Sequence, residues 1–407
     1  MSRFASMSEK NLFPVQRIRD DAHALAVINE LLPLLAEGAL ERDRGRLPPI
    51  RELDLLSRSG LLAITVPAAY GGADVSAHTL AQVSALISQA DPSLGQIPQN
   101  HFYAIEVLRI IGSPAQKTTF FEGVLAGKRF GSAFAERGTR TSAAGDRKTR
   151  LYREGGRWFI SGSKAYCTGA SYADWLAVWL REDDGVQRVA LIPRDAEGVT
   201  VRDDWAGMGQ RTTASGTTIL ERVPVEVDCI LPIEEVFRHP SRLGPFSQLY
   251  HAAIDLGIAR AALSDMKDFV RTRSRPWIDS KADKASDDPL TLQDYGRLTI
   301  DVHVAESLLE LASQSVQAAK HLPSEESVAA ASIAVAQLRI ATNDVALGAS
   351  SKLLEHAGAQ ATLEQYNLDR HWRNARTHTL HDPVRWKSHA IGNFYLNNVL
   401  PARRGSL

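Results

Sequence analysis

The chain has 407 residues, and its 47 lysine and arginine residues balance its 47 aspartate and glutamate residues. A chain of this length exceeds what one hydrophobic core usually holds, so we expect more than one domain. The zero net charge excludes the basic surface of a nucleic-acid-binding protein, and it gives no reason to expect an anionic membrane as a partner.

The first third of the sequence is predicted to be helical. Apolar residues recur at three- and four-residue spacing in one stripe, which consists of Val15, Ile18, Ala22, Leu25, Ile28, Leu32 and Leu35. A second helix is expected between Pro49 and Gly60, and further helices are expected from about Ser76 and Pro114. Residues 1–128 are therefore predicted to form an N-terminal α-helical domain.

The pattern changes near Lys128, where short runs rich in β-branched and aromatic residues begin. Such runs predict strands at 158–160, 175–180, 189–193 and 217–227, and Gly155-Gly156 is expected to turn a hairpin. Residues 129–238 are thus predicted to form a small central β-barrel domain.

Helical periodicity returns after Pro245. Two apolar stripes, within 302–312 and 335–353, predict long helices that lie side by side in an antiparallel bundle. The charged segment 280–289 is expected to be a loop. Residues 239–407 are therefore predicted to form a C-terminal four-helix bundle, which makes the fold α+β. The long apolar stripes also indicate a homo-oligomer.

Cysteine content and the chain's first residues bear on its location. Cys167 and Cys229 are the two cysteines, and they are too few for a disulfide framework or a cysteine-rich metal site. The first ten residues lack the apolar run of a signal peptide, and no apolar run approaches the length of a membrane span. We therefore expect a cytoplasmic protein.

Several short segments follow one another in an informative order. Gly60-Leu61-Leu62 is followed by Tyr70-Gly71-Gly72, and the strand ending at Lys164 leads into Tyr166-Cys167-Thr168-Gly169. The segment 207–211 (GMGQR) and then Val223-Pro224-Val225 complete the set. Together these segments resemble landmarks of the acyl-CoA dehydrogenase superfamily over nearly the full chain, with that family's fold.

The C-terminal segment departs from the dehydrogenases of this family. Those enzymes remove a proton with a glutamate, which in most of them lies in a Tyr-Glu-Gly segment after an arginine-rich stretch. Here the stretch 373–376 (RNAR) is followed by His381-Asp382-Pro383, and the family's other position for the base, within 247–252, holds no glutamate either. This pattern resembles the flavin monooxygenase branch, which includes sulfur-acquisition oxidoreductases and dibenzothiophene monooxygenase.

That resemblance implies a chemistry. Reduced flavin, expected to be FMN (FMNH2) with FAD as the alternative, would come from a separate flavin reductase. O2 would add at flavin C4a, and the resulting C4a-hydroperoxyflavin would oxygenate a small organosulfur compound. The sequence has neither a Gly-x-Gly-x-x-Gly fingerprint nor a Walker loop, which is consistent with electrons arriving on free reduced flavin.

His381 and Asp382 are the first candidates for catalysis, and His378 and His101 are the next. Histidine can donate a proton near neutral pH and so could protonate a flavin peroxide. The structural alternative is that Asp382 caps the last helix and Pro383 occupies its first position. A further alternative, an iron site of His378, His381 and Asp382, is disfavoured because Pro383 argues against a helix there, so no metal is expected.

Further residues follow from the same resemblance. His101 and Tyr103 would border the substrate pocket, although His101 could equally be a histidine of the core. Thr168 would contact the flavin. The other expected flavin contacts are Phe134, Ala135, Ser142, Tyr166, Cys167, Arg273, Arg275 and Gly358.

Two of these groups have specific alternatives. Cys167 is more typical of a small buried hydrophobe than of a redox thiol. Arg273 and Arg275 are expected to reach flavin phosphate across a subunit boundary, most simply in a homotetramer, since arginine binds phosphate through a planar fork. A solvated helix end is their structural alternative.

Two other functions remain open from the sequence. One is an FAD-dependent acyl-CoA dehydrogenase with Asp382 as a displaced base, although aspartate is one methylene shorter than glutamate. The other is a non-catalytic scaffold, which the flavin contacts expected at Thr168 and Arg273 disfavour.

Overall fold

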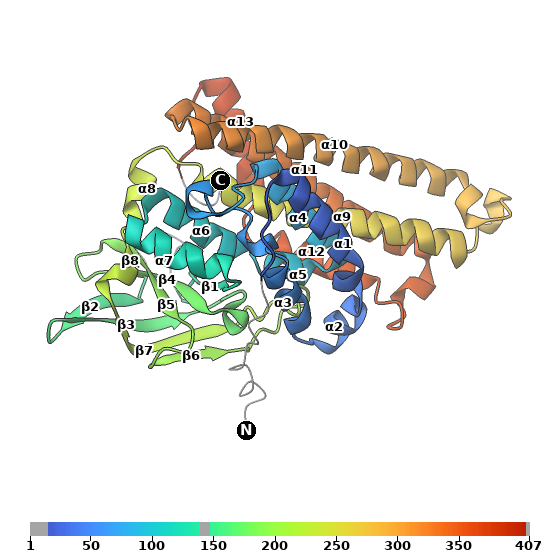
Figure 1. Ribbon diagram of the computed structural model, residues 1–407. Coiled ribbons are helices and arrows are strands. Elements are labelled where there is room, and N and C mark those ends of the chain that lie inside the picture. The colour runs from blue at the N-terminus through green and yellow to red at the C-terminus, as the bar shows by residue number, and fades with distance from the viewer. Residues whose placement is uncertain (1–14, 139–146, 404–407) are drawn as a thin grey trace.

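The computed structural model describes residues 15–138 and 147–403. A group of helices, a sheet and a bundle of long helices follow one another along the chain (Figure 1). The first helices are α1 (Asp21–Ala36), α2 (Ala39–Gly45), α3 (Ile50–Arg58), α4 (Ala77–Ala90), α5 (Pro92–Gln96), α6 (Gln99–Ile111) and α7 (Pro114–Leu125). The helices after the sheet are α8 (Glu234–Arg238), α9 (Leu243–Thr272), α10 (Pro289–His321), α11 (Glu325–Ala357), α12 (Asp369–His378) and α13 (Arg385–Asn397).

Local signals set the ends of the N-terminal helices. The Ser76 side chain caps α4, and Ser113 and Gln116 form a capping box at the start of α7. The first helix is shorter than its apolar stripe predicted, because Asp20 caps α1 and leaves Val15 and Ile18 outside it. Ile18 is nevertheless buried, so the stripe marked core residues correctly while overstating the helix.

The sheet contains β1 (Phe130–Ala133), β2 (Arg150–Glu154), β3 (Arg157–Lys164), β4 (Trp175–Arg181), β5 (Gln187–Pro193), β6 (Val199–Arg202), β7 (Thr217–Val225) and β8 (Ile230–Leu231). Its strand order is β6-β7-β3-β2-β4-β5-β8, with β1 parallel to β4. The Gly155-Gly156 hairpin is confirmed, since Glu154 pairs with Arg157. Within the described ranges, β6 and β8, the two outer strands of this order, are not hydrogen-bonded to each other.

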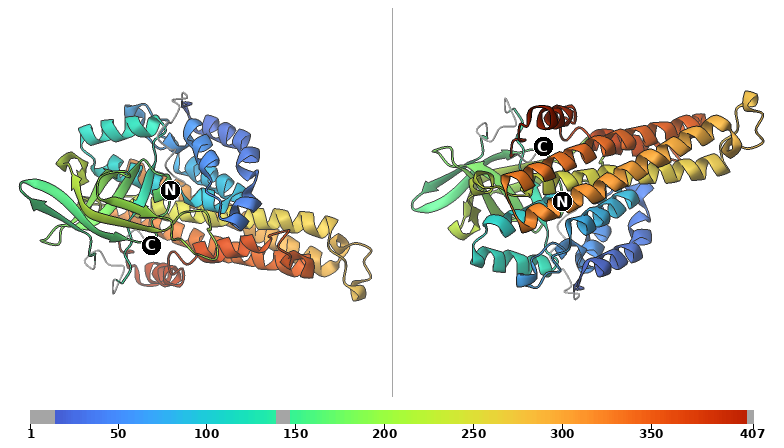
Figure 2. Two further views of the ribbon diagram at one scale, coloured as in Figure 1. Left: turned by 90° about the horizontal axis from the view of Figure 1, so that it is seen from below. Right: turned by 90° about the horizontal axis from the view of Figure 1, so that it is seen from above.

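Three long helices, α9, α10 and α11, form the bundle, and α13 packs against α11 near the sheet (Figure 2). The predicted apolar stripes are confirmed as core: Val302, Ala305 and Leu309 of α10 and Val335 and Leu338 of α11 are buried. The ends of α9 and α11 project away from the sheet together with the loop that joins α9 to α10 (Figures 1 and 2). Neither proposed domain boundary, after residue 128 or after residue 238, cuts a helix or strand.

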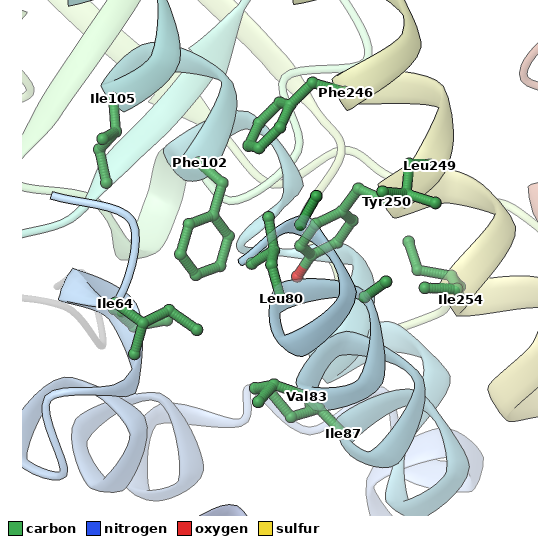
Figure 3. Close-up of a cluster of buried hydrophobic side chains, with 14 of the residues drawn as sticks. Ile64, Leu80, Val83, Ile87, Phe102, Ile105, Phe246, Leu249, Tyr250 and Ile254 are labelled. Atoms are coloured by element: carbon green, nitrogen blue, oxygen red, sulfur yellow. The ribbon is translucent and has the colours of Figure 1, made fainter. Parts of the chain in front are cut away.

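The N-terminal helices hold one end of α9 in place. Phe102 of α6 and Leu80 of α4 pack against Tyr250 and Phe246 of α9 in a closed apolar cluster (Figure 3). Each such large side chain contributes about 1.5–3 kcal/mol when fully buried. This packing fixes the half of α9 that also carries several buried polar residues.

Membrane-spanning potential is confined to one bent pair of helices. Within residues 15–138 and 147–403, no single helix has the length and apolar content to cross a membrane, whereas α1 and α2 together, bent by 53°, do by those two criteria.

Candidate active site

One side of α9 carries polar residues inside the apolar bundle. Gln248, His251 and Asp255 follow at spacings of three and four residues, which places them on one face of the helix. Each is at most 2 % exposed. Because buried polar groups are costly unless they are hydrogen-bonded, the partners of these three residues decide what they do.

His378, at the end of α12, connects two of them. Its Nδ1 lies 2.6 Å from Asp255 Oδ1, and its Nε2 lies 3.0 Å from His251 Nδ1. The other Asp255 oxygen accepts a hydrogen bond from the fully buried Arg339 of α11. Four side chains from three helices therefore form one buried chain of hydrogen bonds.

His381 stands at the solvent-facing end of this chain. Its ring stacks on His251 with centroids 4.3 Å apart and planes 35° apart, and its side chain is 48 % exposed. Its Nδ1 lies 3.2 Å from Asp382 Oδ2, and its backbone N–H donates to the carbonyl of His378. The imidazole of His381 is thus held from two sides while part of its surface remains open.

A second arm runs from Asp382 into the bundle. Gln248 Nε2 donates to Asp382 Oδ2 at 2.8 Å, and Lys387 Nζ donates to Gln248 Oε1 at 3.1 Å. Burial alone would raise the pKa of Asp382, but the hydrogen bond and charge of His381, with Gln248 and Lys387, hold that pKa well below its ordinary value. Asp382 is therefore a carboxylate that accepts hydrogen bonds from its neighbours.

Burial and charge also set the states of the other groups. Burial lowers the pKa of His251 far below its ordinary value, and the charges of its cationic neighbours lower it further. Burial lowers the pKa of Lys387 to about 8, against the pull of Asp382. Burial would raise the pKa of Asp255, but His378 and Arg339 outweigh it and lower that pKa. Asp255 is accordingly an anion, and His251 is a neutral ring.

These contacts and the bounds of α13 test two structural alternatives for the His381-Asp382-Pro383 segment. The capping alternative is wrong, because α13 begins at Arg385 after Val384 and no side chain caps it. The iron-site alternative loses a ligand, since both ring nitrogens of His378 already face Asp255 and His251. Asp382 instead joins His381 to Gln248.

His101 is buried among backbone partners. Its Nε2 lies 2.7 Å from the Leu62 carbonyl, and its Nδ1 accepts from the Phe130 N–H at 3.1 Å. Burial lowers the pKa of His101 to about 4, so the ring is neutral. These contacts match the alternative of a core histidine and leave no ring nitrogen for a substrate.

Tyr103 lies in an aromatic cluster with Phe134. Both rings contact Trp179 of β4, at centroid distances of 6.1 and 4.4 Å. The guanidinium of Arg147 lies 4.9 Å from the ring centroids of Phe134 and Trp179. The cluster joins α6 to the sheet and places Phe134, which is partly exposed, at its border.

The predicted flavin contacts at the end of β3 lie together. Ala135 and Ala165 form a β-bridge, which sets Phe134-Ala135 beside Tyr166 and Thr168. Thr168 Oγ1 is 2.8 Å from Ser215 Oγ, which is 2.7 Å from Thr213 Oγ1. Cys167 is fully buried, and burial raises its pKa to about 11, which fits a small hydrophobe better than a reactive thiol.

Tyr166 has a backbone conformation that its residue type seldom adopts. Its φ is 55°, and its side chain is turned outward, so that the residue is 53 % exposed. Strain of this kind persists where the surroundings impose it, often at functional sites. An exposed aromatic ring beside a cluster of three hydroxyls fits a planar ring system with polar edges, such as a flavin. Ser142, another predicted contact, lies outside the described residues.

Contacts along α12 connect the segment that carries part of the hydroxyl cluster to the helix that carries His378. The Gln210 N–H donates to Asn374 Oδ1 at 2.6 Å, and Arg373 donates to the carbonyl of Met208. A Cβ at Gly209 would lie 2.0 Å from the Arg373 carbonyl, so the segment 207–215 approaches α12 as closely as glycine allows. The helix that carries His378 is therefore fixed to the loop that carries Ser215.

Arg273, Arg275 and Gly358 lie elsewhere, at the end of the bundle that projects away from the sheet (Figure 1). Arg273 contacts the Tyr366 ring and hydroxyl, and Ser274 binds the His356 carbonyl. Gly358, with φ 73° and ψ −168°, ends α11. One chain does not bring these residues to Thr168.

Among the described residues, Asp294, Glu355 and His356 lie close enough together to hold a metal ion. Lys352 Nζ already donates to Asp294 and Glu355, at 2.9 and 2.8 Å. Both carboxylates thus already share a cationic partner within the chain.

The sequence interpretation missed five residues of the network: Gln248, His251, Asp255, Arg339 and Lys387. A signal was present, because polar residues at helical spacing interrupt the apolar stretch of α9. The same holds for Arg339, which lies next to the predicted stripe residue Leu338 of α11.

Comparison with known proteins places the chain among similar enzymes. The acyl-CoA dehydrogenase N-terminal, middle and C-terminal domains match residues 16–128, 131–223 and 249–386. The chain is 32 % identical to a probable FMNH2-dependent monooxygenase, SfnC, of Pseudomonas putida, covering 93 % of this chain and 96 % of that one. It is 33 % identical to a dibenzothiophene monooxygenase of Rhodococcus erythropolis, covering 94 % and 95 %.

Solved structures agree with these matches. FMN-bound TdsC from Paenibacillus sp. A11-2 superposes with a TM-score of 0.89 at 32 % identity, covering 94 % of this chain and 100 % of that one. Methanesulfinate monooxygenase MsuC from Pseudomonas fluorescens gives 0.87 at 30 % identity, covering 94 % and 99 %.

Proposed function

The chain belongs to the acyl-CoA dehydrogenase superfamily, in the branch of the FMNH2-dependent monooxygenases, and we propose that it oxygenates a small organosulfur compound in a two-component system. The enzyme is a flavin-dependent oxidoreductase, and its cofactor is FMN. The alternative function is that of an FAD-dependent acyl-CoA dehydrogenase with Asp382 as the base.

His381 carries the proposal. Its ring is half exposed, held by Asp382 on one side and stacked on His251 on the other. An imidazole in this setting can act as a general acid and base toward a bound oxygen species, because one of its nitrogens can donate a proton and the other can accept one. Asp382, by contrast, is buried and hydrogen-bonded, which makes it a poor base for removing a substrate proton.

FMN would be held by the residues that gather beside Thr168. Reduced FMN supplies the electrons that activate O2. The exposed rings of Tyr166 and Phe134 offer apolar surface to the flavin, and the Thr168 hydroxyl can donate or accept a hydrogen bond at its polar edge. A flavin bound over these rings would cover them from water, and a dry site would limit the loss of activated oxygen as peroxide.

Sulfur compounds are the proposed substrates because of the relatives. The similar enzymes are named for dibenzothiophene and methanesulfinate, which differ greatly in size and charge. Their common feature is a sulfur atom that can accept oxygen. The reduced flavin would come from a separate flavin reductase, and a cytoplasmic location stays a prediction.

We also propose a homo-oligomer, most simply a tetramer, in which a second copy completes the flavin site. Arg273, Arg275 and Gly358 stand at the projecting end of the bundle, away from Thr168 of their own chain. The same end exposes Trp277 and Ile278. Exposed apolar side chains next to arginines fit contact with another copy that presents a phosphate-bearing ligand.

The test uses purified protein mixed with reduced FMN under anaerobic conditions and then with O2. Dibenzothiophene and methanesulfinate serve as separate probes, and both product and hydrogen peroxide are measured. We expect an oxygenated product, little peroxide, and weaker binding of oxidised than of reduced FMN. Tightly retained stoichiometric FAD with acyl-CoA oxidation would establish the dehydrogenase instead. Peroxide alone with each sulfur compound would overturn the proposed substrate class.

A further inference from the structure

We propose that Asp255 is a positioning residue for His381, because through His378 it fixes the orientation of the His251 ring on which His381 stacks. The effect on oxygenation rests on the proposed function. The effect on the His381 ring itself does not, and it can be measured without flavin.

Hydrogen-bond direction runs from Asp255 outward. An ionised carboxylate only accepts, so the 2.6 Å contact requires a proton on His378 Nδ1. His378 Nε2 then faces His251 Nδ1 at 3.0 Å, and one proton lies between them. The His378 ring is thereby held at both of its nitrogens, and the His251 ring is held at its Nδ1.

Burial makes this chain necessary for orientation. His378 is 1 % exposed and Asp255 is fully buried, so water cannot replace a missing partner. The ring torsion of histidine is otherwise broad and nearly two-fold. If the carboxylate is lost, the His378 ring can turn over, and His251 loses the partner that holds it against His381.

Loss of the Asp255 carboxylate would also change the net charge around His381. Among the residues that the structure describes, the charged groups that face His251 and His381 come from several surrounding elements: Asp255 from α9, Arg339 from α11, His378 from α12, Lys387 from α13 and Asp382 from the connecting loop. Apart from the histidines, these are two anions and two cations. Removal of the Asp255 charge leaves an excess of positive charge, which disfavours a proton on His381.

A matched control lies further along the same two helices. His371 of α12 meets Asp265 of α9 at 2.7 Å, with no hydrogen bond toward His381. Asp265→Asn removes a carboxylate that also contacts a histidine of α12 and an arginine, and it leaves the network that reaches His381 untouched.

The experiment is an NMR titration of the full-length protein carrying histidine labelled at ring carbon ε1, with His381→Asn used for assignment. In Asp255→Asn we expect the midpoint of His381 to fall by about one pH unit, roughly a tenfold change in its proton affinity. Asp265→Asn should leave the midpoint where it is in the wild type. An unchanged midpoint in Asp255→Asn overturns the proposal.

Asp255→Asn leaves Arg339 without its buried anionic partner, which endangers folding, so His378 provides a second route. His378→Gln keeps the Asp255–Arg339 pair and can still bridge Asp255 and His251 through its amide. His378→Leu keeps the pair but cannot bridge. We expect the pH profile of product yield to be near that of the wild type in His378→Gln and to differ from it in His378→Leu, which no longer holds the His251 ring against His381.

A uniform loss at every pH in both His378 variants would indicate a merely structural role and would overturn the proposal. The two hypotheses fail separately. If the His381 midpoint shifts as expected while the wild type makes no oxygenated product, the positioning role stands and the proposed function falls.

Discussion

Two histidine–aspartate pairs join α12 to α9, and they differ in what lies behind them. His378–Asp255 and His371–Asp265 have nearly equal contacts, 2.6 and 2.7 Å. The second nitrogen of His378 reaches His251, and through that ring the network reaches His381. The second nitrogen of His371 is buried without a hydrogen-bond partner among the described residues.

The carboxylates differ in the same way. Asp255 is fully buried and paired with Arg339, whereas the side chain of Asp265 is 33 % exposed and paired with Arg370. The same two residue types therefore dock one helix on another at one end of α12 and orient an exposed imidazole at the other end. The two pairs differ because His378 connects onward through His251 to His381, whereas His371 does not. The contact distance within each pair does not show this difference.

The largest expected effect concerns His381. Replacing it with alanine should lower oxygenated product by about two to four orders of magnitude, the usual range for losing a positioned acid–base group. Peroxide should rise in step, and His381→Asn should be milder if hydrogen bonding suffices. His371→Ala is the counterpart and should retain the ratio of product to peroxide. The ratio of product to peroxide is the quantity to measure. A wild-type ratio in His381→Ala would show that His381 has no role in the mechanism.

Stability should separate the two pairs next. Arg339→Met leaves Asp255 buried with one partner fewer, and we expect a loss of about 3–5 kcal/mol in the free energy of unfolding. Arg370→Met affects a partly exposed carboxylate that keeps His371, so about 1 kcal/mol or less is expected. Urea denaturation measures both, and equal losses would show that burial does not distinguish the pairs.

The acid limb of stability should depend on Asp265. Burial would raise its pKa, but His371 and Arg370 outweigh burial and lower the pKa to about 2. A carboxylate with a lowered folded-state pKa stabilises the fold above its unfolded pKa, near 4, and loses that contribution as pH falls toward 2. Wild type should therefore lose about 1–2 kcal/mol more than Asp265→Asn between pH 4 and pH 2, with allowance for partial exposure. Parallel unfolding curves for the two proteins would contradict this.

The smallest effect is expected beyond both pairs, at the projecting end of α9. If a second copy brings its flavin phosphate to Arg273, Arg273→Ala should weaken reduced-FMN binding about tenfold, or about 1.4 kcal/mol. Arg271→Ala, one residue before the end of the same helix, is the matched control and should change little. Sedimentation of the wild type at micromolar concentration should show an oligomer, and a monomer would contradict the shared site.

Much of the fold followed from local pattern. The hairpin at Gly155-Gly156, the start of α4 at Ser76 and the buried stripes of α10 and α11 depend on turn chemistry, capping and periodicity, which neighbouring residues encode. The short helix α2 and the true start of α1 did not follow, because an apolar stripe marks burial and does not distinguish a helix from the extended segment before it.

The site divides in the same manner. By itself, the sequence predicted, through its resemblance to the family, that His381-Asp382-Pro383 stands where related dehydrogenases carry a glutamate segment and that Thr168 lies in the strand turn that contacts the flavin. The tertiary structure alone decided that His101 binds backbone groups, that Asp382 is no helix cap, and that Asp255, more than a hundred residues from His378 in the chain, is its partner. The physical reason is that capping, turns and periodicity act between near neighbours. The states and roles of buried ionisable groups instead depend on which distant side chains share their enclosure.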